Sequence, residues 1–190
     1  MSRSILAPFD KFSAEGAAVG RLLAGYSGIE IDLLHCVQMA RGGDFDTVLK
    51  QMFRFRGETR RIDEAQKLSQ GNYQHLDLTE EFREAIAVVR YCLKIRNQYA
   101  HWVWWDDSSG KLAFANPEDL ARCEAPVNDF LNLKPNHVDV TLLTQQESYF
   151  IYASELLNWV NYEGRFRDGR LNSGNPLSKP QATLRPKLHL

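Results

Sequence analysis

The residues from Ala14 to Ala40 carry the longest regular pattern in this sequence. Apolar side chains recur there at the three- and four-residue spacings of one helix face, and they are Leu23, Tyr26, Ile29, Leu33, Leu34 and Val37. In proteins, most of the stability of an amphipathic helix comes from packing its apolar stripe against other elements. The pattern therefore predicts a protein built mainly of packed helices, and Gly42-Gly43 is expected to end this one.

Further segments repeat the helical pattern. A short helix is expected around Phe45 to Phe55, and a charged helix around Thr59 to Ser69, with Gly71-Asn72 as a break. The next helix can be capped by Asp77 or Thr79 and should run to about His101. These segments are close enough along the chain for neighbouring helices to run antiparallel.

The second half of the chain begins with a non-helical insertion. WVWW and KLAFA flank the turn-rich DDSSG, which predicts two short strands around a turn. Asn116-Pro117 should start a short helix that reaches about Cys123. A capping box, Thr144-Gln145-Gln146-Glu147, predicts a last long helix that ends near Arg165. The expected fold class is all-α, an up-and-down helical bundle with a small β-hairpin insertion after the helix that ends at His101.

Length and composition predict the domain organisation. A chain of 190 residues fits one domain, here residues 1–167. From Asp168 onward the sequence has three prolines and no helical or strand period, and six Lys or Arg lie between Gly164 and Leu190. Residues 168–190 are therefore predicted to be a basic, flexible tail unless a partner holds them.

Charge and cysteine content limit the classes of function. The net charge of −1 excludes a uniformly basic nucleic-acid binder, yet four arginines surround Glu58. These candidates for RNA binding are Arg54, Arg56, Arg60 and Arg61, and a solvated surface is the alternative. Three widely spaced cysteines and the lack of an 18-residue apolar run predict a reduced, cytoplasmic compartment and no membrane insertion.

Arg96, Asn97 and His101 interrupt an apolar and aromatic run, RNQYAHWVWW. On a helix Asn97 and His101 share a face, whereas Arg96 and His101 differ by about 140°. All three are expected to border the buried face, so each needs a partner. A structural explanation is an ion pair between Arg96 and Glu30, which lies on the apolar stripe of the first helix, with His101 capping carbonyls.

The form R-N-x-x-A-H offers a different explanation. Residues 96–101, RNQYAH, resemble the R-x4-H motif of the HEPN superfamily, which comprises α-helical domains of defence, toxin and RNA-processing systems. The match covers six residues near the end of a long helix in a mostly helical chain. Beyond these residues, the resemblance extends to the architecture of roughly residues 14–165 alone.

The resemblance implies a metal-independent endoribonuclease whose composite site forms where two motif helices meet in a homodimer. His101 would then be the acid or base, Arg96 would stabilise charge on the phosphate, and Asn97 would orient the site, with Glu30, Tyr99 and Trp102 in support. RNA would be the substrate, and a toxin–antitoxin or antiviral-defence role would imply a neutralising partner protein. The alternative is a catalytically inactive HEPN-like domain that binds a nucleotide or a protein.

Other sites receive little support from the sequence. The remaining histidines lack paired ligands at metal spacing, so no metal site is expected. Glycine-rich phosphate loops and nucleophile elbows are missing from the sequence, so no cofactor is expected. Trp102, Trp104 and Trp105 could stack on bases, or they could form a small satellite core.

Overall fold

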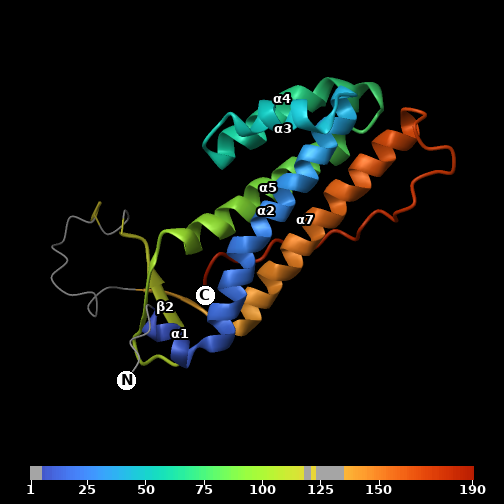
Figure 1. Cartoon of the computed structure of the whole chain (residues 1–190). Coiled ribbons are helices and arrows are strands. Elements are labelled where there is room, and N and C mark those ends of the chain that lie inside the picture. Colours follow the sequence, from blue (N-terminus) through green and yellow to red (C-terminus); the bar gives the residue numbers. More distant parts are fainter. Residues whose placement is uncertain (1–5, 118–120, 123–134) are drawn as a thin grey trace. The chain divides into compact units, whose positions relative to one another are not determined.

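The computed structural model describes residues 6–117, 121–122 and 135–190. In these ranges the chain is mostly helical with one small antiparallel sheet (Figure 1). The elements are α1 (Ala7–Lys11), α2 (Ser13–Arg41), α3 (Phe45–Phe53), α4 (Glu58–His75), α5 (Thr79–Ala100), β1 (Val103–Asp106), β2 (Leu112–Ala115), β3 (Asn136–Val138) and α7 (Val140–Arg167). The helices predicted from Ala14 to Ala40 and from Thr79 to about His101 are confirmed, because α2 and α5 match them closely.

Two helices differ from the prediction. The break at Gly71-Asn72 was wrong, because α4 continues through it to His75. Tyr73 explains why: it is fully buried, stacks on Phe82 with ring centroids 4.3 Å apart, and donates a hydrogen bond to the Cys36 carbonyl. Packing of this kind outweighs the cost of one glycine in a helix, which is about 1 kcal/mol.

The start of α7 was also predicted wrongly. The helix begins at Val140, four residues before the expected capping box. Asp139 acts as the cap, since its Oδ1 accepts a hydrogen bond from the Leu142 backbone N–H at 2.8 Å. The short helix expected from Asn116 to Cys123 lies largely outside the described residues.

The chain forms two compact units, and α2, α5 and α7 each contribute to both. The motif unit comprises Met1–Ala24, Lys94–Ser148 and Arg185–Leu190, and the helical unit comprises Gly25–Leu93 and Tyr149–Leu184. The predicted boundary at residue 167 and the flexibility of residues 168–190 stay predictions. In the described ranges, no helix is both long and apolar enough to cross a lipid bilayer.

Buried and half-buried side chains form hydrogen bonds across the helices of the helical unit. The Cys36 thiol of α2 donates to the Leu157 carbonyl of α7 at 3.2 Å. Ser154 of α7 donates to Asp32 of α2, and Tyr152 of α7 donates to Glu84 of α5 at 2.6 Å. Each hydrogen bond joins two helices, so α7 is attached to α2 and to α5 by specific contacts as well as by apolar packing.

The motif unit contains the sheet, in the order β1-β2-β3 with both pairs antiparallel. The strand pair predicted around DDSSG is present as β1 and β2. The third strand, β3, was not predicted, and it pairs Asn136 with Phe114. The central strand β2 is buried along its whole length. The sheet therefore forms a small core beside the end of α5.

The turn between β1 and β2 is bonded to β3. His137 of β3 forms a hydrogen bond with Asp107, with 2.7 Å between Nε2 and Oδ2. Hydrogen bonds from Ser109 and His137 lower the pKa of the Asp107 carboxyl to about 2. This carboxylate therefore remains ionised at neutral pH and holds the short third strand against the turn.

Candidate functional site

The six motif residues occupy the end of α5 and the position after it. Asn97 and His101 are exposed and Arg96 is half-buried, whereas Gln98 and Tyr99 are only 5% and 3% exposed. The prediction that all three motif residues border the buried face was therefore wrong for Asn97 and His101. Because α5 ends at Ala100, His101 leaves the helical period and reaches solvent.

Arg96 and Asn97 are joined by a hydrogen bond. The Arg96 Nη1 donates to the Asn97 Oδ1 at 3.0 Å. This contact fixes the direction of the Asn97 amide, since its oxygen must face the guanidinium. The Asn97 amide therefore presents its nitrogen, a hydrogen-bond donor, to groups other than Arg96.

Asn97 and His101 line the same open pocket, which has a volume of about 470 Å³. The described residues around it are Lys94, Asn97, Gln98, His101, Trp102, Asn116, Asn136, Leu188 and His189. None of these described lining residues is acidic, while one ammonium and two imidazoles are present. Such a lining suits an anionic ligand, and imidazoles are the side chains that exchange protons most readily near neutral pH.

The segment 185–190 forms one wall of this pocket. Gln98 Nε2 donates to the Leu188 carbonyl at 2.8 Å. Gln146 Nε2 donates to the carbonyls of Lys187 and Leu188, at 2.8 and 3.1 Å. The Leu190 N–H donates to the His137 carbonyl at 3.0 Å. We call Gln98 and Gln146 the glutamine pair, since both hold the backbone of the same segment.

The glutamine pair is buried, and hydrogen bonds fix the orientation of the Gln146 amide. Gln146 is fully buried, and its Oε1 accepts a hydrogen bond from the Tyr99 hydroxyl at 2.5 Å. Burial raises the pKa of the Tyr99 phenol above its ordinary value, so the hydroxyl stays protonated and donates. With its oxygen bonded to Tyr99, the Gln146 amide can present only its nitrogen to the 185–190 backbone.

Gln98, Gln146 and His189 were not predicted as site residues from the sequence. One signal for Gln146 was present: it lies four residues after Leu142 and four before Phe150, on an apolar helix face. A polar side chain there needs a buried partner. No pattern near position 189 indicates that this histidine reaches the motif.

Two of the tryptophans belong to a small aromatic core. Trp102 stacks on the buried Phe114 with centroids 4.4 Å apart, and Trp104 contacts both Phe9 and Phe114. The satellite-core interpretation therefore holds for these two side chains. Trp102 also lines the pocket, so it remains a candidate for contact with a ligand.

Glu30 and the arginine cluster lie in the helical unit. Glu30 pairs with Arg61, from Oε1 to Nε at 2.8 Å, and both side chains are 12% exposed. The predicted partner of Glu30, Arg96, was therefore wrong, because Arg61 is the cation at this carboxylate. Arg61 also donates to the Phe55 carbonyl, which makes it an internal cation. The exposed candidates for an RNA surface are therefore Arg54, Arg56 and Arg60.

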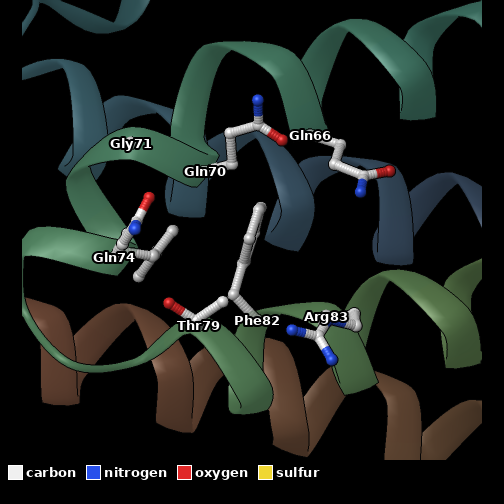
Figure 2. Close-up of a pocket in the computed structure, with 8 residues that line it drawn as sticks. Gln66, Gln70, Gly71, Gln74, Thr79, Phe82 and Arg83 are labelled. Carbon is white, nitrogen blue, oxygen red and sulfur yellow. The ribbon is translucent and has the colours of Figure 1, made fainter.

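The helical unit has a polar pocket of its own, of about 390 Å³, between α4 and α5. Figure 2 shows Gln66 and Gln70 of α4 on one side, with the ring of Phe82 projecting from α5 toward Gln70. Arg83, which also lines it, is paired with Glu80 at 2.7 Å. The described lining holds no histidine, so this pocket is suited to hydrogen bonding rather than to proton transfer.

Comparisons of the chain with protein-family models, with curated proteins and with solved structures give no match. Within the described ranges, no three His, Cys, Asp or Glu side chains gather closely enough to hold a metal ion.

Proposed function

We propose that this chain is a metal-independent endoribonuclease of the HEPN type that acts at the pocket around His101. The observation that supports it best is the pocket itself. It gathers Asn97 and His101 with Lys94, and no acid occurs among its described lining residues. A phosphodiester carries one negative charge, so a cationic pocket with proton-transfer groups matches both its charge and its chemistry.

The reaction is a transesterification in which RNA supplies its own nucleophile. The ribose 2′-oxygen loses a proton and bonds to phosphorus, the bond from phosphorus to the 5′-oxygen breaks, and that oxygen gains a proton. His101 is the acid or base, and Arg96 stabilises the charge that develops on the phosphate. Asn97 orients the site, an assignment supported by its hydrogen bond to the Arg96 guanidinium. Tyr99 supports the site through its hydrogen bond to Gln146.

We further propose an up-and-down helical bundle that dimerises through α5 and α2, so that two motif helices form one composite site. In a two-fold contact the same surface of each copy faces the other copy, so the polar motif residues of both copies meet at one interface. Sedimentation at micromolar concentration is expected to give the mass of a dimer. A monomer at that concentration would contradict the composite site without contradicting RNA binding.

The wild-type protein is expected to cut mixed single-stranded RNA in the presence of EDTA. Its products should carry a 2′,3′-cyclic phosphate and a 5′-hydroxyl, because the nucleophile belongs to the RNA. These ends can be identified by mass spectrometry. DNA of the same sequence is the matched control and should stay intact, since it lacks the 2′-hydroxyl. A folded protein that leaves varied RNAs uncut would favour the inactive alternative, a domain that binds a nucleotide or a protein.

If the nuclease is a toxin or a defence effector, a neutralising protein that covers the His101 pocket would control it. The exposed position of His101 makes the pocket accessible to such a partner.

A further inference from the structure

We infer that His189 is a second proton-transfer group of the His101 pocket and that the segment 185–190 carries it there. The inference rests on the proposed ribonuclease function and names a residue outside the R-x4-H motif. It begins from the fact that His101 and His189 line one pocket, although 88 positions separate them in the sequence.

The position of His189 is set by backbone hydrogen bonds on both sides of it. The Gln98 amide nitrogen bonds to the carbonyl of Leu188, directly before His189, and the N–H of Leu190, directly after it, bonds to β3. Burying an amide without a hydrogen-bond partner costs on the order of 1–3 kcal/mol in proteins. The glutamine pair therefore favours the state in which segment 185–190 is in place, and His189 is held at the wall of the pocket.

The reaction needs a proton acceptor at the 2′-oxygen and a proton donor at the 5′-oxygen. One imidazole is either neutral or protonated at the start of a turnover, so two histidines can fill both roles at once. One histidine, neutral, takes the proton of the 2′-hydroxyl as the 2′-oxygen bonds to phosphorus. The other histidine, protonated, gives its proton to the 5′-oxygen as the bond from phosphorus to that oxygen breaks. Lys94 supplies a fixed positive charge to the phosphate oxygens. Exchange with water restores both histidines, so no further reactant is needed.

The two roles can be told apart by the leaving group. A 5′-thiolate leaves without a proton, so an RNA whose scissile 5′-oxygen is replaced by sulfur needs a base but no acid. The enzyme variant that lacks the acid should therefore recover its rate on this substrate, and the variant that lacks the base should not.

The experiment uses the full chain and one short single-stranded RNA, made with either oxygen or sulfur at the same 5′ position. We expect His189→Gln to cut the ordinary RNA on the order of 10²-fold more slowly than wild type. Between His189→Gln and His101→Gln, one variant should return to within a few-fold of the wild-type rate on the sulfur RNA. His75→Gln removes an exposed histidine from the end of α4 and should cleave both substrates as wild type does.

Several outcomes would overturn the inference. A His189→Gln protein that cleaves ordinary RNA within about twofold of wild type would remove His189 from the chemistry. Slow variants with no recovery on the sulfur RNA for either histidine would leave His189 as a positioning residue. His189→Ala is the control for any effect of the amide that His189→Gln introduces, and its melting temperature should equal that of the wild type. If the wild type cuts neither RNA, the proposed function itself fails. This outcome is distinct from those above, in which the wild type is active and the role of His189 alone fails.

Discussion

His101→Ala is expected to slow RNA cleavage by on the order of 10²-fold or more, because the proposed function makes this imidazole the general acid or base. Arg96→Ala should cause a loss of similar size by removing charge stabilisation at the phosphate. Initial rates at saturating RNA, measured in EDTA, provide the comparison.

His101 is exposed and lies beyond the end of α5, so the alanine variant should melt at the wild-type temperature. Melting and cleavage should be measured on the same preparations. An inactive His101→Ala protein with unchanged melting beside an active wild type supports the nuclease. A His101→Ala variant that cleaves RNA at the wild-type rate would exclude this imidazole from the reaction.

The largest loss of stability is expected from Arg61→Ala. This change leaves the Glu30 carboxylate, whose side chain is 12% exposed, without the cation that now lies 2.8 Å from it. Breaking one side of a buried ion pair costs about 3–5 kcal/mol, because the remaining charge has lost its compensation. Urea unfolding of wild type and variant measures the difference.

Two further variants make the test of the Glu30 pair specific. Arg60→Ala removes the neighbouring arginine, which is exposed, and should change stability by no more than about 0.5 kcal/mol. Adding Glu30→Gln to Arg61→Ala should restore part of the loss, since a neutral amide is less costly to bury than a carboxylate. Equal stability of Arg61→Ala and wild type would show that the pair contributes nothing.

Local patterns predicted the long helices and the β1–β2 strand pair well, and they predicted poorly the features that depend on tertiary contacts. The apolar period of α2 spans seven turns or so, which leaves no other regular structure that could bury it. Glycine at position 71 indicated a break only because the burial of Tyr73 depends on Phe82 and Cys36, neither of which is local. The strand β3 has three residues, too few for a period, and it exists because β2 pairs with it.

The site shows the same division between local and distant information. The local motif of residues 96–101 was enough to predict Asn97 and His101 as site residues, and both line one pocket. The place of Glu30 on an apolar helix face predicted that it needs a cation, but the wrong arginine was chosen, because the helical period does not indicate which neighbouring side chain faces it. Gln98 and Gln146 donate hydrogen bonds to backbone carbonyls about 90 and 41 positions away. Every residue has a backbone carbonyl, so the sequence does not indicate which one accepts the bond.

The way in which the motif unit is assembled from three separate stretches of chain also sets when it can form during synthesis. Residues 187–190 are made about 90 positions after Gln98, and ribosomes add on the order of 5–20 residues per second. For several seconds, therefore, a nascent chain contains the R-x4-H motif but lacks the segment that completes its pocket. The pocket that contains His101 and His189 is therefore incomplete until residue 189 has been made.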